Sequence, residues 1–287
     1  MIISASRRTD LPAYYSDWLL RRLSEGRVLV RNPMNSAQVR EVDLSREAVD
    51  ALVIWTKNPL PLMSMLDALK PYACCFLFTL TSYGKDIEPG IPSKNGELIP
   101  TFIRLAGEFG AKSLVWRYDP ILINEKYTPE YHVKYFSTIA KKLRGHTARC
   151  VISFMDFYRC TQKQARALGI RELPDSEKLE LAQKLCNAAM ENGMEVFACA
   201  EELDLGPAGI PPASCIDARL LSQIAGKDIS AAKDKNQRKA CGCAASVDIG
   251  AYDTCLGGCG YCYATHSAAR SLSNAKAHDP ASPFLIP

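Results

Sequence analysis

The sequence of 287 residues has no apolar run long enough to cross a membrane, and its opening apolar stretch, residues 1–6, is too short for a signal peptide. It also has no internal repeat and no low-complexity tract, which excludes solenoid and disordered classes. We therefore expect a cytoplasmic globular protein that does not engage membranes.

The net charge is also small, because Lys and Arg exceed Asp and Glu by only +4. An excess this small does not by itself indicate a nucleic-acid-binding protein. The single basic run, KDKNQRK at residues 233–239, contains an acidic residue and no aromatic one. We interpret it as a solvated loop, with a phosphate-binding patch as the alternative.

Histidine is scarce, and the four histidines at positions 132, 146, 266 and 278 show no metal-ligand spacing. Cysteine, in contrast, is abundant, with 12 residues, seven of them from Cys199 onward. In a reducing compartment such a number argues against disulfides, and the uneven distribution argues for metal. We expect Cys74, Cys75, Cys150, Cys160 and Cys186 to be ordinary core or surface thiols.

The most informative stretch is CLGGCGYCYA at residues 255–264, in which Cys255, Cys259 and Cys262 have the spacing C-x3-C-x2-C. We call residues 255–262 the cysteine loop. Its glycines allow a short loop to turn three side chains inward. Three thiolates are one fewer than a closed [4Fe-4S] site needs, so one iron would stay open for chemistry. A zinc knuckle or three reduced core thiols are the alternatives.

A second thiol set comprises Cys199, Cys215, Cys241 and Cys243. Four thiols suffice for a closed site, so we predict a second [4Fe-4S] cluster or a zinc ion with four thiolate ligands. The alternative is that Cys199 and Cys215 are buried core residues.

Short β-branched apolar segments alternate with amphipathic helical patterns, which favours parallel strands with crossover helices. The expected strands are residues 2–6, 52–56, 74–81, 114–117, 150–154, 196–199 and 247–250, and the expected helices are residues 14–25, 60–69, 98–109, 129–143, 177–192 and 264–275. Residues 28–44 are expected to form a hairpin-like insertion. The fold class is α/β, as a complete or partial TIM-like (β/α) barrel.

Charged residues follow five of the expected strands and would meet at the carboxyl-end face of such a barrel, where active sites lie. These residues are Arg7, Arg8, Lys57, Arg117, Asp119, Asp156 and Glu201. A simpler reading is that strand ends are polar loops. Arg117 and Asp119 could equally pair with neighbours and hold the barrel mouth together.

The cysteine loop resembles that of the radical S-adenosylmethionine enzymes. The resemblance implies that Cys255, Cys259 and Cys262 hold a [4Fe-4S] cluster, that S-adenosylmethionine binds its open iron, and that Tyr261 lies near the adenine. That superfamily begins with its cysteine loop, whereas here the loop follows the last strand. We therefore expect a circularly permuted barrel in which residues 247–250 pack beside residues 2–6. Residues 1–200 would form the barrel body, and residues 201–287 a cysteine-rich segment that completes it.

The chain as a whole is similar to an uncharacterised bacterial and archaeal family, domain-of-unknown-function family 1848. The resemblance rests on ISASRRTD (3–10), VRNP (30–33), WTKNP (55–59), WRYDP (116–120), VISF (151–154), KDKNQR (233–238), CGC (241–243), DIG (248–250) and the cysteine loop. It implies no particular reaction. The tail CGYCYA (259–264) is also similar to spore photoproduct lyase, which repairs thymine dimers in DNA.

The leading hypothesis is a radical S-adenosylmethionine enzyme that takes electrons from a reductant such as ferredoxin or flavodoxin. Its substrate would be a small molecule or a nucleic acid. Arg7, Arg8 and Tyr261 are the candidate cofactor-binding residues, and Lys57, Arg117, Asp119, Asp156 and Glu201 the candidate catalytic ones. Two alternatives remain. One is an iron-sulfur electron-transfer or sensing protein, and the other is a zinc-stabilised barrel, such as a nucleic-acid-processing module.

Overall fold

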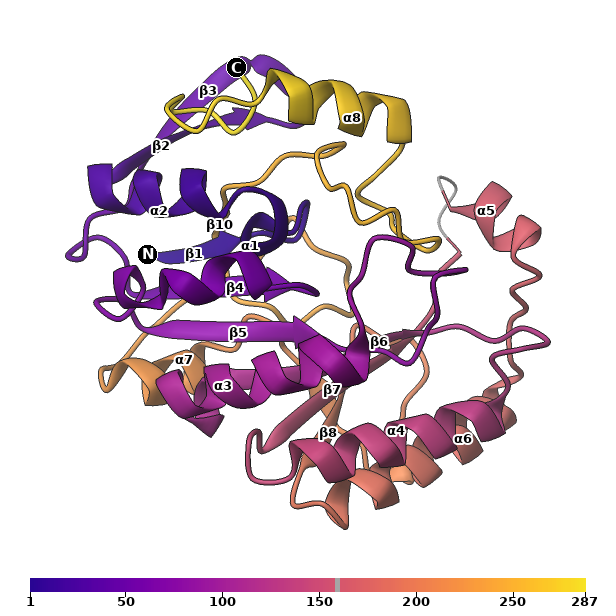
Figure 1. Ribbon diagram of the computed structural model, residues 1–287. Helices are drawn as coiled ribbons and strands as arrows, with labels where there is room; N and C mark the ends of the chain where they lie inside the picture. Colours follow the sequence, from indigo (N-terminus) through magenta and orange to yellow (C-terminus); the bar gives the residue numbers. More distant parts are fainter. Residues whose placement is uncertain (158–160) are drawn as a thin grey trace.

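The fold is built on one curled parallel sheet that forms a half-barrel and does not close (Figure 1). The computed structural model describes residues 1–157 and 161–287. The strand order is β10-β1-β4-β5-β6-β7-β8-β9, and every neighbouring pair is parallel. The bounds are β1 Ile2–Ala5, β4 Ala51–Thr56, β5 Cys74–Thr79, β6 Leu114–Ile121, β7 Arg149–Phe154, β8 Glu195–Cys199, β9 Pro212–Ala213 and β10 Val247–Asp248.

The seven strands expected from the sequence are all present, and the predicted α/β class with a parallel sheet is confirmed. The sequence analysis missed β9, which adds two residues to the edge of β8. A closed barrel is not what the chain forms, since β9 and β10 stand at opposite ends of the sheet.

Strand β10 pairs with β1, so the C-terminal part of the chain lies beside the N-terminus, as the sequence analysis expects. Ile3 is paired with Val247 and Ser4 with Asp248. The Asp248 carboxylate accepts hydrogen bonds from Ser4 Oγ at 2.9 Å, Ser6 Oγ at 2.5 Å and the Arg7 amide at 2.8 Å. Strand β10 has only two residues, so these side-chain bonds supply much of the contact between it and β1.

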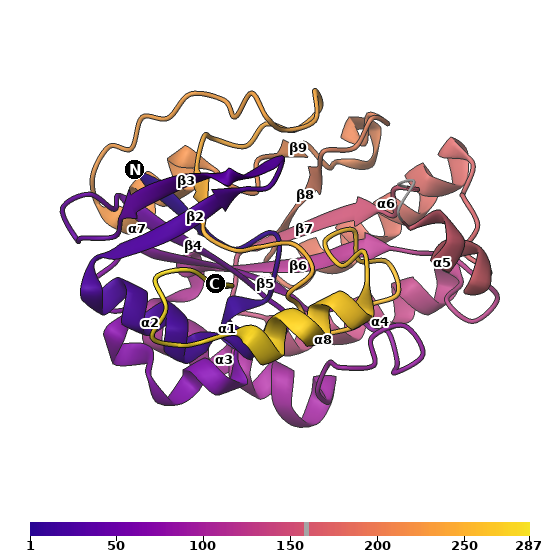
Figure 2. The same cartoon turned by 90° about the horizontal axis from the view of Figure 1, so that it is seen from above.

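Helices pack on both faces of the sheet. The α-helices are α1 Leu11–Tyr14, α2 Ser16–Glu25, α3 Ile99–Phe109, α4 Pro129–Leu143, α5 Gln162–Ala167, α6 Asp175–Met190, α7 Ala218–Ala225 and α8 Ala268–Ala277. Helices α1, α2, α3, α4 and α6 cover the convex face of the sheet (Figure 2), whereas α7 packs on the concave face. Helix α4 has the predicted bounds because Thr128 Oγ1 accepts the Tyr131 amide at 3.2 Å and Pro129 occupies the first position. No helix in the described residues is both long and apolar enough to cross a membrane.

Two helix predictions need correction. Residues 60–69 form two 3₁₀ turns, Leu60–Ser64 and Leu66–Ala68, since Pro61 supplies no amide donor and Met65 adopts φ −128°. The last helix begins at Ala268 rather than residue 264, because Ser267 is its N-cap and the loop continues up to it. The expected hairpin is present as the antiparallel pair β2 Arg27–Asn32 and β3 Asn35–Asp43.

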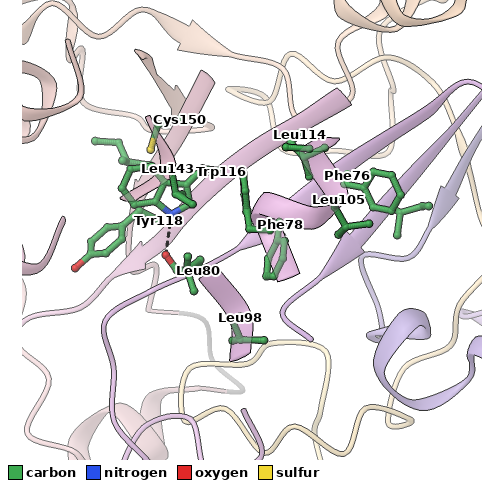
Figure 3. Packing of buried hydrophobic residues seen from close by; sticks show 14 of the residues in the cluster. Phe76, Phe78, Leu80, Leu98, Leu105, Leu114, Trp116, Tyr118, Leu143 and Cys150 are labelled. Carbon is green, nitrogen blue, oxygen red and sulfur yellow. Dashed lines mark hydrogen bonds between the residues drawn. The ribbon is translucent and has the colours of Figure 1, made fainter. Parts of the chain in front are cut away.

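The two faces of the sheet are buried against different parts of the chain. On the convex face, Phe76, Phe78, Trp116 and Tyr118 alternate along β5 and β6 and pack with residues of α3 and α4 (Figure 3). The Trp116 indole also donates to the Leu80 carbonyl at 2.8 Å. The intervening residues face the concave side, where they pack against residues 215–244: Cys75, Leu77, Val115 and Val151.

The segment after β9 therefore fills the inside of the half-barrel. Burial of its apolar side chains, such as Ile216 and Leu221, places Cys215, Cys241 and Cys243 against the inner face of the sheet. The hydrophobic effect is what holds this segment in place, since it contains no strand before β10.

Acid should destabilise the fold through His132, which is fully buried on α4. Its Nδ1 lies 2.8 Å from the Tyr118 hydroxyl and its Nε2 lies 2.9 Å from the Leu122 carbonyl. Burial lowers the pKa of His132 from 6.5 to about 4. Between these values the unfolded chain binds a proton that the folded chain does not, so stability falls as the pH falls.

We expect His132 alone to remove about 3 kcal/mol of unfolding free energy as the pH drops from about 7 to about 4. Urea unfolding at several pH values, compared between the parent and His132→Gln, measures this contribution. The variant should lose stability less steeply with acid, and identical slopes would show that His132 is not responsible.

Candidate functional site

A cavity of about 450 Å³ lies at the carboxyl ends of the strands. Its wall includes residues that follow β1, β4, β7 and β8 and residues of the last half of β6. Of the charged residues expected there, those that line it are Arg7, Arg8, Lys57, Arg117, Asp119 and Asp156. Both groups of thiols line the same cavity: Cys255, Cys259 and Cys262 with Cys199, Cys215, Cys241 and Cys243.

The cysteine loop is closed at its base by a hydrogen bond from the Asp253 amide to the Ala264 carbonyl, 3.0 Å long. The Asp253 carboxylate in turn accepts the amides of His266 at 2.5 Å and Ser267 at 3.0 Å, which joins the loop to the start of α8. His266 precedes this helix, so it is a loop residue bound to Asp253 and not the helix residue that the sequence suggested.

Gly257 lies between two of the three sulfurs. A Cβ atom at this position would lie 3.5 Å from Cys255 Sγ and 3.7 Å from Cys259 Sγ. The Tyr14 hydroxyl lies 3.5 Å from the same point, so two sulfurs and one hydroxyl surround the Gly257 backbone. That the loop surrounds a metal cluster stays a prediction.

Two thiols of the cysteine loop, Cys255 and Cys259, have a pKa above that of an ordinary cysteine. Burial raises the pKa of Cys255 to about 12, and Asp10 and Cys262 add to the effect. Burial likewise raises the pKa of Cys259, although Lys57 lowers it in part. A metal that binds here must therefore displace protons, and its charge would compensate for three thiolates in a poorly hydrated place.

A second loop, residues 81–91 after β5, supports the cysteine loop from one side. The Gly90 amide donates to the Gly257 carbonyl at 3.1 Å, and the Gly260 amide donates to the Ile87 carbonyl at 2.8 Å. The backbones approach so closely that a Cβ on Gly90 would lie 2.8 Å from the Gly257 oxygen.

Glu88, on this second loop, is a functional candidate that the sequence analysis missed. Its side chain is 1% exposed and accepts hydrogen bonds from Lys57 Nζ at 2.9 Å, Thr81 Oγ1 at 2.8 Å, Lys94 and the Tyr261 hydroxyl. Burial opposes ionisation, but Lys57 and Lys94 outweigh it and lower the pKa of Glu88 to about 2. A buried carboxylate thus fixes Lys57 and Tyr261 beside the thiols.

Tyr261 and Lys57 are also in contact with each other, because the Lys57 ammonium lies 5.2 Å from the centre of the Tyr261 ring. Both residues line the cavity. Glu88 could not be found from the position of a strand end, since it comes nine residues after β5.

Asp10, the last residue of the ISASRRTD motif, is a further charged residue that follows β1 and lines the cavity. It is the N-cap of α1, and its carboxylate accepts the Ala13 amide, Thr56 Oγ1 at 2.8 Å and the Lys57 amide at 2.7 Å. Burial raises its pKa to about 6, and these hydrogen bonds lower it in part. Asp10 therefore connects the ends of β1 and β4 at the edge of the cavity.

The four cysteines of the second thiol set contact one another in a chain along another part of the cavity wall. Cys199 Sγ lies 2.9 Å from Cys215 Sγ, and Cys243 accepts hydrogen bonds from Cys215 and Cys241. The hydrogen bond from Cys215 lowers the pKa of Cys199 to about 7, and Arg117 contributes. The tertiary structure thus brings together thiols that are separated by up to 44 residues in the sequence.

Arg117 is buried at this wall. It donates to Cys215 Sγ at 3.2 Å and forms an ion pair with Asp119, whose carboxylate also accepts a hydrogen bond from Ser153. Asp156 forms an ion pair of 2.5 Å with Arg238. Arg117 and Asp119 therefore do pair with each other at the mouth of the sheet, the simpler of the two roles weighed from the sequence.

Other predicted residues lie elsewhere. Glu201 does not line the cavity; its carboxylate accepts the Phe154 amide at 2.7 Å, and burial raises its pKa to about 7. Cys74, Cys75, Cys150 and Cys186 are buried thiols outside the cavity wall, as expected. Cys160 lies outside the described residues.

The basic run at residues 233–239 is only partly the solvated loop that the sequence suggested. Lys233, Lys235 and Lys239 are exposed, but Asn236, Gln237 and Arg238 line the cavity. The Asp234 amide donates to the Cys243 carbonyl at 2.9 Å, which fixes this run over the second thiol set. Burial of the neighbouring cysteines therefore decides the position of the charged loop.

The cysteine loop suits a cluster in the chemistry of its donors, since its three thiols line one cavity. A single zinc ion needs its ligand atoms converging to about 2.3 Å from one point. In the described part of the chain, no three His, Cys, Asp or Glu side chains are arranged to hold one ion.

Fold and site together define a class of protein: a parallel α/β half-barrel with a thiol-lined cavity at the carboxyl ends of its strands. The chain belongs to the family described as Domain of unknown function (DUF1848), whose model matches residues 2–264 and so includes all seven cavity thiols. No curated protein and no solved structure matches the chain.

We predict that Gly90→Ala impairs metal loading of the cysteine loop without unfolding the protein. The added methyl group overlaps the Gly257 carbonyl, and overpacking of this kind costs about 1–3 kcal/mol. Iron content per chain after anaerobic reconstitution is the measurement. Gly107→Ala on α3 is the matched control, because a Cβ there meets no atom within 4 Å. Full iron loading in Gly90→Ala would contradict the proposed support of one loop by the other.

Proposed function

We propose that the protein is a radical S-adenosylmethionine enzyme in which Cys255, Cys259 and Cys262 bind a [4Fe-4S] cluster. The observation that carries the proposal is the glycine-rich loop of three thiols that opens into the cavity at the strand ends. When bound, such a cluster supplies an electron for reductive cleavage of S-adenosylmethionine to a 5′-deoxyadenosyl radical. The half-barrel is then a circularly permuted form of the superfamily barrel.

The network around Glu88 positions groups for the cofactor. Glu88 binds the Tyr261 hydroxyl and the Lys57 ammonium, so the Tyr261 ring and the charge of Lys57 are fixed beside the thiols before any ligand binds. Preorganised groups of this kind avoid the cost of ordering side chains on binding. We assign the Tyr261 ring to the adenine and Lys57 to the carboxylate of S-adenosylmethionine.

We assign the part of the cavity wall around the second thiol set to the substrate. Arg117, Asp119 and Asp156 line it together with the second thiol set. We propose that this set holds a second cluster, since Cys199, Cys215, Cys241 and Cys243 form one continuous group. A zinc ion is the alternative, and its binding would require these side chains to move closer together. The charge of four thiolates would be offset mainly by the metal, and in part by Arg117 and Arg238, which both favour the thiolate of Cys199.

A small-molecule substrate fits the cavity better than DNA does. The cavity volume of about 450 Å³ lies within the range of small-molecule pockets, about 300–1,000 Å³. A repair enzyme similar to spore photoproduct lyase would need a wider groove with a basic rim. The electron donor would be a small reductant such as ferredoxin or flavodoxin.

The decisive experiment is anaerobic reconstitution with iron and sulfide, followed by reduction with dithionite and incubation with S-adenosylmethionine. We expect chromatography to show 5′-deoxyadenosine, and we expect Cys259→Ala to abolish it because that variant lacks one of the three ligands. Cys186→Ala makes the same chemical change on α6, away from the cavity, and should keep the activity.

Two other outcomes of this experiment would each support one of the alternative functions. Cluster absorbance without 5′-deoxyadenosine would indicate an electron-transfer or sensing protein. Stoichiometric zinc with little iron in anaerobically purified protein would indicate the zinc-stabilised barrel.

The second thiol set should bind metal independently of the cysteine loop. Replacing Cys215 and Cys243 together by Ala should remove the metal of that set and leave the iron bound by the cysteine loop, since the two groups share no ligand. Metal analysis of this double variant beside Cys255→Ala measures the two contents separately. If the double variant has the metal content of the parent protein, the second set is a group of core thiols.

A further inference from the structure

Two guanidinium groups lie over the same aromatic side chain in the cavity. The centre of the Arg117 guanidinium is 4.7 Å and that of Arg7 is 5.3 Å from the Trp55 ring centroid. The Trp55 indole is fixed by a hydrogen bond of 3.1 Å to Ser4 Oγ, which itself donates to Asp248. All three of these side chains, Arg7, Trp55 and Arg117, line the cavity.

These two arginines differ in their partners. Arg117 has Asp119 and Cys215, whereas Arg7 forms no side-chain ion pair or hydrogen bond with the described residues. Arg7 Nη2 is buried and without a hydrogen-bond partner, and so is Arg117 Nε. Buried donors in this state cost stability, and most of them in native proteins find a partner in protein, water or ligand.

The other cavity cations are already paired. Lys57 is bound to Glu88 and Arg238 to Asp156, while Arg8 donates to the Gly250 carbonyl at 3.3 Å and lies over the Tyr252 ring. Arg7 is thus the cavity cation for which the described part of the chain provides no carboxylate and no carbonyl.

Arg7 lies beside the second thiol set. It shares the Trp55 ring with Arg117, which donates to Cys215 Sγ at 3.2 Å. Lys57, in contrast, lies 5.2 Å from the centre of the Tyr261 ring in the cysteine loop. A cofactor held by the cysteine loop and Lys57 would leave Arg7 for another molecule.

We propose that Arg7, with Trp55 and Arg117 behind it, forms an anion subsite that binds a carboxylate or phosphate group of the substrate. The inference that the anion is the substrate's rests on the proposed function, but binding of the anion itself does not. A guanidinium has several parallel donors, which match the oxygens of such a group. Because the charge of Arg117 is shared with Asp119, Arg7 supplies most of the attraction. Asn236 lines the same cavity and could contact the rest of the substrate.

The protein contains its own reporter for this site. Of its three tryptophans, Trp18 and Trp116 are fully buried and only Trp55 is in the cavity. Titration of the purified protein with inorganic phosphate, and separately with acetate, should produce a saturable change in tryptophan fluorescence. Trp55→Phe should lose the signal, and equilibrium dialysis with labelled phosphate then measures binding in that variant directly.

Arg7→Gln should weaken binding of the preferred anion by about tenfold or more, because it removes a charge-assisted contact. Arg8→Gln is the matched control. It removes the same charge from the neighbouring position, but its guanidinium already has protein partners, so we expect a change of less than about threefold. Thermal unfolding of both variants verifies that each is folded.

Three results would overturn the proposal. Equal losses in the Arg7 and Arg8 variants would show general attraction to a positive cavity. Unchanged anion affinity in Arg7→Gln together with reduced metal content would show that Arg7 serves the thiols. Competition between phosphate and S-adenosylmethionine would assign the subsite to the cofactor. Failure to form 5′-deoxyadenosine, with anion binding intact, would count against the proposed function alone.

Discussion

The pairing of β10 with β1 is the contact on which the site depends. It joins two segments about 240 residues apart in the chain, and it rests on a ladder of two residue pairs and on three hydrogen bonds that the Asp248 carboxylate accepts from residues 4–7. Because the cysteine loop follows β10 directly, this pairing determines which end of the sheet the thiols reach. Gly250 allows the chain after β10 to lie this close to Ser6, since a Cβ atom on Gly250 would be only 2.1 Å from Ser6 Oγ.

Both thiol groups of the cavity have positively charged neighbours. Near the cysteine loop, Lys57 and Lys94 share the single buried carboxylate of Glu88, which leaves one positive charge in excess. Near the second thiol set, Arg117 is paired with Asp119 and Arg238 with Asp156, so Arg7 is the cation without a carboxylate partner among the described residues. A molecule in the cavity therefore meets excess positive charge near each thiol group.

The sequence indicated more of the fold than of the site. Seven of the eight sheet strands and the bounds of α4 follow from alternation, β-branched residues and the Thr128-Pro129 start signal. Local pattern failed at residues 60–69, where proline and the backbone of Met65 interrupt a stretch with helical periodicity. It also missed Glu88, because what makes this residue notable is its burial and its long-range partners, which a linear pattern does not contain.

By itself the sequence determined the spacing of the three loop thiols, the glycines between them and the order of strands along the chain, since these depend on covalent neighbours and local backbone preferences. Only the tertiary structure decided that four thiols from β8, the loop after β9 and the CGC segment form one group, and that Arg7 lacks the partner its neighbours have. The physical reason is that both facts depend on burial in the concave face of the half-barrel. Apolar packing of residues 215–244 against the sheet fixes positions that no local interaction specifies.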